Sequence, residues 1–183
     1  MRLSLQPHPD WRSEAVAAVA VEIARPGADR LVLTYRLTGA IGRIALPPPA
    51  SPARADELWK STCFEAFLRP SEGEAYFEFN FAPSRRWAAY RFDGYRGGMT
   101  LAEVAAPVIE PQAAADGYAL KAGLDLGALR GASPGARWRL GLSAVIEEVG
   151  GAKSYWALAH PPGKPDFHHA CAFALDLAAG DFA

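Results

Sequence analysis

The sequence lacks an excess of charge of either sign. Its 19 Lys and Arg residues nearly balance 20 Asp and Glu residues, which gives a net charge of -1 over 183 residues. Proteins that bind phosphate backbones or anionic lipid usually carry a broad positive field, and the charge balance of this chain provides none. We therefore expect neither nucleic acid nor a membrane as a partner.

Long apolar runs and cysteines are also scarce. Two prolines, an aspartate and an arginine within residues 7–12 interrupt the stretch where a secretion signal needs continuous apolar residues. No later run has the length that a membrane-spanning helix requires. The only cysteines are Cys63 and Cys171, and without an export signal such a pair is typical of two buried thiols. These features predict a reducing, cytoplasmic setting.

Sustained helical periodicity is missing as well, whereas alternation of apolar and polar residues recurs along the chain. In residues 31–37, for example, Leu31, Leu33, Tyr35 and Leu37 fall on one face of an extended segment. Because successive side chains of a strand point to opposite faces, this pattern predicts strands with one buried face. The predicted strands are 15–24, 31–37, 58–69, 75–82, 87–92, 117–126, 138–147, 154–159 and 170–177.

So many short strands, each bounded by Gly, Pro, Asp or Ser, are typical of an all-β protein. We predict a single domain over residues 1–183, built as an antiparallel β-sandwich of the jelly-roll or immunoglobulin-like kind. Short helical turns are expected at 50–58 and at 125–131, where Asp125 lies near the start of the second turn.

Residues 76–81 carry the most informative alternation. Their three phenylalanines fall on one face, which we predict to be core, and Tyr76, Glu78 and Asn80 fall on the other. If this strand forms a hairpin with the preceding one across residues 70–74, Glu65 shares a face with Glu78 and Asn80. That face would hold two carboxylates, an amide and flanking rings.

Such a face suits a ligand rich in hydroxyl groups. Sugars have apolar faces that stack on Trp or Tyr, and hydroxyls that hydrogen-bond to carboxylates and amides. The alternative for each residue is structural, since Trp and Tyr often lie in sandwich cores and strand Glu or Asn often faces water. The predicted ligand-binding residues are Trp59, Glu65, Tyr76, Glu78, Asn80, Trp87 and Trp156, with Tyr90 as a further aromatic platform.

Glu65 and Glu78 allow a second interpretation as a general acid and a general base, the roles that paired carboxylates have in glycosidases. Spacing along the sequence does not fix their separation in space. We therefore predict a binding domain without catalytic residues, and keep a carboxylate-dependent, glycan-acting enzyme as an alternative.

Three residues near the carboxyl end, His168, His169 and Cys171, are of types that ligate zinc or iron, and His160 lies upstream. Their spacing matches no common zinc pattern. On a strand, His169 and Cys171 would share one face and His168 would lie on the other. We therefore predict no metal site here.

Five segments together resemble the bacterial DOMON-like proteins that are related to the family-9 carbohydrate-binding modules. This resemblance implies a β-sandwich that binds a sugar or haem on one face, and it points to Trp59, Glu65, Glu78, Asn80, Trp87 and Trp156 as contacts. The segments are LWKSTCFEAFL, YFEFNFAPSRRWAAYRFDGYR, WRLGLSAVIE, SYWALAHPPGKPDFHH and CAFALDL.

Haem is the alternative ligand that the resemblance implies. Haem-binding relatives use a methionine and a histidine as axial ligands. Met99, in the glycine-rich segment GGMT, is the only methionine apart from Met1, and His168 is the candidate histidine. The leading interpretation needs no cofactor.

Overall fold

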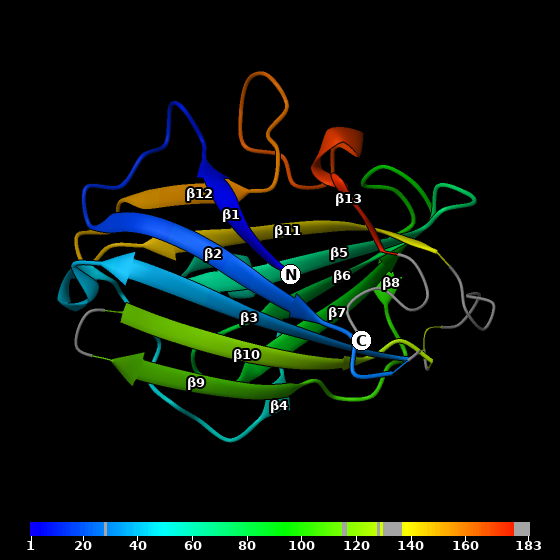
Figure 1. Cartoon of the computed structure of the whole chain (residues 1–183), viewed down its shortest axis with the longest axis horizontal. Helices are drawn as coiled ribbons and strands as arrows, with labels where there is room; N and C mark the ends of the chain where they lie inside the picture. The colour runs from blue at the N-terminus through cyan, green and yellow to red at the C-terminus, as the bar shows by residue number, and fades with distance from the viewer. Residues whose placement is uncertain (28, 115–116, 128, 130–136, 178–183) are drawn as a thin grey trace.

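The computed structural model describes residues 1–27, 29–114, 117–127, 129 and 137–177. These residues form strands joined by loops and three short 3-10 helices (Figure 1). Among them, no helix is long and apolar enough to cross a membrane. The strands are β1 (Arg2–Pro7), β2 (Val16–Ala24), β3 (Arg30–Gly39), β4 (Ala53–Arg54), β5 (Cys63–Pro70), β6 (Tyr76–Phe81), β7 (Arg86–Phe92), β8 (Thr100–Leu101), β9 (Val108–Ala114), β10 (Gly117–Asp125), β11 (Trp138–Glu147), β12 (Lys153–Ala157) and β13 (Leu175–Leu177), and the helices are η1 (Ile41–Arg43), η2 (Leu58–Lys60) and η3 (Ala170–Ala172).

The strands form one curled sheet. Its hydrogen-bonded order is β4-β7-β6-β5-β11-β12-β1-β2-β3-β10-β9, with β13 beside β11 and β8 beside β7. Every pairing is antiparallel except that of β4 with β7. The strand β1 joins the two arms, because its first half pairs with β2 and its last residues, Gln6 and Pro7, pair with β12.

The two arms face each other across the main core. In Figure 1, the arm of β2, β3, β10 and β9 lies in front of the arm of β11, β5, β6 and β7. The ring of Phe64 on β5 lies 5.0 Å from that of Tyr35 on β3 and 6.2 Å from that of Tyr118 on β10. The three phenylalanines of β6 are buried in the same core, as their alternation predicts. The predicted all-β, mostly antiparallel class is confirmed.

Several boundaries differ from the prediction. The strand expected from residue 58 begins only at Cys63, because Glu57 adopts a left-handed backbone conformation (φ 60°) and residues 58–60 form η2. The strand expected at 170–177 is divided into η3 and β13. The turn expected at 50–58 holds β4 instead, before η2 begins at its end.

The second predicted turn, at 125–131, is described only in part. The amide of Leu129 donates to the carbonyl of Leu126 at 3.1 Å, which closes a turn, whereas residues 128, 130 and 131 lie outside the described residues. Four strands were not predicted: β1, β9 and the two-residue strands β4 and β8. Prolines at the end of β1 and within β9 obscure their alternation, and both strands are tolerated because proline removes only a single donor from each ladder.

The two cysteines are free thiols, and Cys63 is buried as predicted. Cys171 is exposed, so the prediction of two buried thiols is wrong for this residue. It lies in η3 rather than on a strand, and its sulfur is 3.1 Å from Nδ1 of His169.

Candidate functional site

The hairpin of β5 and β6 forms as predicted. Glu65 lies opposite Asn80, and Phe67 lies opposite Glu78, so Glu65, Glu78 and Asn80 share one face. This face is the outer side of the arm, turned away from the main core. All three polar side chains are nonetheless buried, with exposed fractions of 3%, 6% and 0%. Something other than the opposite arm must cover them.

Two loops provide the cover. One follows β7 and contains residues 93–99, and the other connects β12 to η3. Asp166 joins them, because its carboxylate accepts hydrogen bonds from the hydroxyl of Tyr95 at 2.5 Å and from the guanidinium of Arg96 at 2.8 Å. The backbone amide of His168 donates to the same carboxylate at 3.1 Å. A single side chain therefore holds both loops over the strand face.

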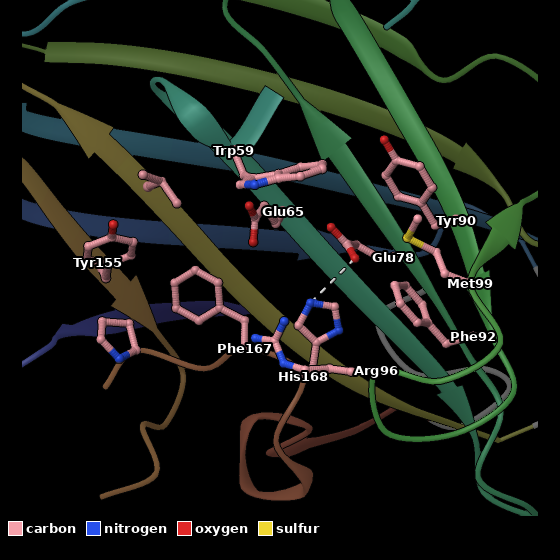
Figure 2. Close-up of a pocket in the computed structure, with 12 residues that line it drawn as sticks. Trp59, Glu65, Glu78, Tyr90, Phe92, Arg96, Met99, Tyr155, Phe167 and His168 are labelled. Atoms are coloured by element: carbon pink, nitrogen blue, oxygen red, sulfur yellow. Dashed lines mark ion pairs between the residues drawn. The ribbon is translucent and has the colours of Figure 1, made fainter. Parts of the chain in front are cut away.

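A cavity of about 420 Å³ remains between the loops and the strands. Figure 2 shows the carboxyl groups of Glu65 and Glu78 directed into this space, with Trp59 on one side and His168 on the other. Besides the imidazole of His168, five larger aromatic rings contribute to its wall, together with a few polar groups. These rings belong to Trp59, Tyr90, Phe92, Tyr155 and Phe167.

The two carboxyls have few polar partners. Ser143 donates to one oxygen of Glu65 at 3.1 Å, and Asn80 donates to one oxygen of Glu78 at 2.7 Å. Burial, with the nearby charge of Glu78, raises the pKa of Glu65 to about 8. Burial also raises the pKa of Glu78. At neutral pH the pair therefore retains a proton, so one carboxyl can donate a hydrogen bond as well as accept one.

His168 is neutral beside this pair. Its Nε2 lies 3.7 Å from a Glu78 oxygen, the contact drawn as a dashed line in Figure 2. Burial, with the charge of Arg96, lowers the pKa of His168 to about 4, so the contact is not an ion pair at neutral pH. Nδ1 lies 2.7 Å from the hydroxyl of Tyr76, which accepts a hydrogen bond from the amide of Arg96. If Tyr76 donates its own proton to Nδ1, the N–H of Nε2 points toward Glu78.

The structure brings only part of the predicted set into the cavity. Trp59, Glu65 and Glu78 line it, and Trp59 is 39% exposed at its edge. Tyr76 and Asn80 lie buried beneath it, where they hold His168 and Glu78 through hydrogen bonds. The roles of these five residues in binding stay predictions.

The other two predicted residues, Trp87 and Trp156, lie in the main core on the opposite face. Trp87 packs under the guanidinium of Arg54, and the indole N–H of Trp156 donates to Ser154. The alternation of side chains within each strand already predicts that these two rings face away from the cavity. In β7, Trp87 is an odd number of positions from Tyr90, which does line the cavity, so the two rings must face opposite ways.

Sequence reasoning missed Arg96, Tyr155 and Phe167. It considered Met99 only as a haem ligand, and His168 only as a metal or haem ligand. Tyr155 precedes Trp156 on β12 and therefore takes the opposite face, which alternation would have shown. Arg96 and Phe167 are on loops, whose side chains follow no period. No sequence signal places them in the cavity.

Met99 and His168 do line the same cavity, as the haem alternative requires. The remaining groups do not fit a haem. Glu65 and Glu78 occupy the cavity wall, where an apolar porphyrin face would leave their free oxygens without partners. Both ring nitrogens of His168 already face polar groups, Tyr76 and Glu78. Within the described residues, no group of three or more His, Cys, Asp or Glu is placed to hold a metal ion.

No protein-family model and no curated protein matches this chain. Among solved structures, it is similar to a Bacteroides uniformis protein provisionally described as carbohydrate-binding, with 14% sequence identity and a TM-score of 0.68 over 93% of this chain and 83% of that one. A family-9 carbohydrate-binding module from Caldicellulosiruptor kristjanssonii is also similar, in complexes with glucose (11% identity, TM-score 0.47, covering 83% and 71% of the two chains) and with cellotriose (10%, 0.45, 83% and 69%). At these identities, the first similarity shows the fold alone.

Proposed function

We propose that the cavity between Trp59 and His168 binds a carbohydrate or a similar polyol and does not transform it. The observation that carries this proposal is the convergence of two buried carboxyls, Glu65 and Glu78, in a cavity walled by aromatic rings. We infer a sandwich in which the two arms of the sheet act as the layers, with the site on the outer face of one arm.

The chemistry of the wall fits a sugar. An aromatic ring packs on the apolar face of a sugar ring, and Trp59 and Tyr90 are placed for this contact. A carboxyl pair that shares a proton both donates to and accepts from hydroxyl groups. The cavity volume of about 420 Å³ lies within the range of about 300–1,000 Å³ that is common for small-molecule sites.

The fold similarity to the Bacteroides uniformis protein, which is provisionally described as carbohydrate-binding, supports the proposal. The resemblance of the sequence to DOMON-like proteins implies the same class of ligand and stays a prediction. A cytoplasmic location, as the sequence predicts, would make the ligand a soluble sugar or glycoside rather than an extracellular polymer.

A calorimetric screen of neutral mono- and disaccharides tests the proposal directly. We expect at least one to bind, and Trp59→Ala to weaken that binding by about tenfold, the effect of losing one stacking contact worth about 1.4 kcal/mol. Val108→Ala, an exposed apolar residue on β9, is the control and should leave binding unchanged. Absence of binding to every sugar, or equal affinity in the Trp59→Ala variant, would contradict the proposed site.

A second candidate function is acid-base catalysis on a glycan. The raised pKa of Glu65, to about 8, favours it, because a carboxyl that stays protonated at neutral pH can act as a general acid beside a second carboxyl. Chromogenic aryl glycosides would reveal such activity. A rate that disappears in both Glu65→Gln and Glu78→Gln, while folding is retained, would replace the binding proposal with this one. A rate equal to the buffer background would exclude hydrolysis of those substrates.

A further inference from the structure

Two acidic side chains but only one arginine line the cavity, among the residues that the structure describes. Among the described residues that line it, Arg96 is the only cationic side chain, and its guanidinium is bound to Asp166 at 2.8 Å. His168 is neutral at neutral pH. Glu65 and Glu78 are therefore two carboxyls in one cavity without an ion pair to any lysine or arginine that the structure describes, although the charge of Arg96 partly offsets the rise in the pKa of each.

The partners of the carboxyls are neutral. Ser143 holds one oxygen of Glu65, and the other oxygen of Glu65 accepts no hydroxyl or amide donor from the described residues. Asn80 holds one oxygen of Glu78, and the other faces Nε2 of the neutral His168 at 3.7 Å, beyond hydrogen-bond distance. Both side chains are more than nine-tenths buried. A carboxylate buried in this way is costly unless an opposite charge joins it. No described lysine or arginine forms an ion pair with either carboxyl, so we expect a bound ligand to supply the positive charge.

The aromatic wall favours a positive ligand as well. The faces of Trp, Tyr and Phe rings carry partial negative charge and attract an ammonium group within about 6 Å. Trp59 and Tyr90 lie close together, with ring centroids 6.2 Å apart at an angle of 72°, and Phe92 and Tyr155 line the same space. Rings at such angles, together with two carboxyls, can surround a compact cation.

We propose that the ligand of this cavity carries a protonated amine, held between Glu65 and Glu78 and surrounded by the aromatic rings. The inference rests on the proposed function for the rest of the ligand, and within that function it identifies the ligand as an amino sugar rather than a neutral sugar. Arg96, bound to Asp166, stays at the rim.

Binding of an ammonium group should be coupled to the release of a proton from the carboxyl pair. Before binding, the carboxyl pair retains one proton, and when the ammonium group enters, that proton leaves to solvent while the ammonium keeps its own. The bound state is a carboxylate pair facing a cation, and one proton at most is released for each ligand. A neutral sugar causes no such release. The titratable or charged groups around the pair come from the elements packed against it. They are His168 and Arg96 from the loops, Tyr35 from β3, Cys63 from β5, Tyr76 from β6, Tyr90 from β7 and Tyr155 from β12.

Calorimetry at pH 7 with three matched ligands tests the inference: glucosamine, glucose and N-acetylglucosamine, with the galactose and mannose series in parallel. Titrations in two buffers of different ionisation enthalpy also give the number of protons released. We expect an amine to bind about tenfold or more tightly than its hydroxyl and acetamido counterparts, with release of up to about one proton. The preference for the amine should disappear in the double variant Glu65→Gln with Glu78→Gln. It should persist in the control variant Glu110→Gln, because Glu110 is exposed and pairs with Lys121.

The outcomes separate this inference from the function on which it rests. Equal binding of all three ligands would overturn the amine while leaving a sugar site. If no sugar binds, the affinity for n-propylammonium is measured and compared with that for n-propanol, which has the same length but no charge. Binding of the ammonium alone would support the amine and overturn the sugar, whereas binding of neither would overturn both. The comparison of ligands on the unaltered chain needs no variant, so a double variant that fails to fold does not weaken the test.

Discussion

The hydroxyl of Tyr35 donates a hydrogen bond to the backbone carbonyl of Glu65 at 2.6 Å, across the core from β3 to β5. Tyr35 is fully buried, so this bond joins the two arms of the sheet directly behind the cavity. The backbone position of Glu65, which lines the cavity, therefore depends on a contact with the opposite arm.

Tyr35→Phe should therefore destabilise the fold by about 1–2 kcal/mol, because it removes one buried hydrogen bond and leaves a carbonyl without this donor. Denaturant unfolding measures the change. Tyr118→Phe is the matched control, since the Tyr118 hydroxyl is buried and has no hydrogen-bond partner among the described residues. That variant should be neutral or slightly stabilising. Equal losses in both variants would show that the bond to Glu65 contributes nothing specific.

The stability of the protein should fall as the pH rises through the range of the Glu65 carboxyl. Its pKa is about 8 in the folded chain against an ordinary value of 4.5. Between these two pH values, Glu65 loses its proton in the unfolded chain and keeps it in the folded chain. The free energy of unfolding is therefore highest, as far as Glu65 is concerned, below about pH 4.5, and it decreases as the pH rises to about 8. The loss is on the order of a few kcal/mol.

Thermal unfolding from pH 4.5 to pH 9 tests this relation, with Glu65→Gln as the key variant. Glutamine does not ionise, so the variant should gain stability relative to the unaltered chain as the pH rises. Glu110→Gln should run parallel to the unaltered chain, because Glu110 is exposed on β9. Parallel curves for Glu65→Gln as well would mean that Glu65 ionises normally.

Asp166→Ala should release the two loops that cover the cavity. The variant removes the acceptor for Tyr95, Arg96 and the amide of His168. The bonds from Tyr95 and Arg96 are exposed to water, so we expect each of these two to contribute no more than about 1 kcal/mol. We expect hydrogen exchange of residues 93–99 and 163–169 to accelerate at least about tenfold. Exchange in β3 should not change. Asp176→Ala, which removes an exposed pair with Arg139, is the control, and the same acceleration in it would contradict the assigned role.

Haem added to the purified chain should give no shifted Soret band, because the groups of the cavity wall do not fit a porphyrin. Absorbance from about 380 to 450 nm after haemin titration checks this expectation. The informative variants are Met99→Ala and His168→Ala. A band that appears in the unaltered chain and disappears in both variants would restore haem as the ligand and remove the sugar.

The sequence by itself determined which side chains share a face within each strand. Alternation in a pleated strand has a period of two, and this local rule separated Glu78 and Asn80 from the phenylalanines of β6. The short connection from Pro70 to Tyr76 fixed the hairpin register that places Glu65 on the same face. Applied to β7 and β12, the same rule would also have separated Trp87 and Trp156 from the cavity.

Only the tertiary structure decided which of those faces became a site. The outer face of β5 and β6 would meet water if the loop after β7 and the loop before η3 did not close over it, and the bond between Arg96 and Asp166 joins residues 70 positions apart. Alternation along a strand carries no information about such contacts. Burial, and with it the raised pKa of Glu65, arises from them, because desolvation depends on every segment packed around a carboxyl and not on its neighbours in the chain.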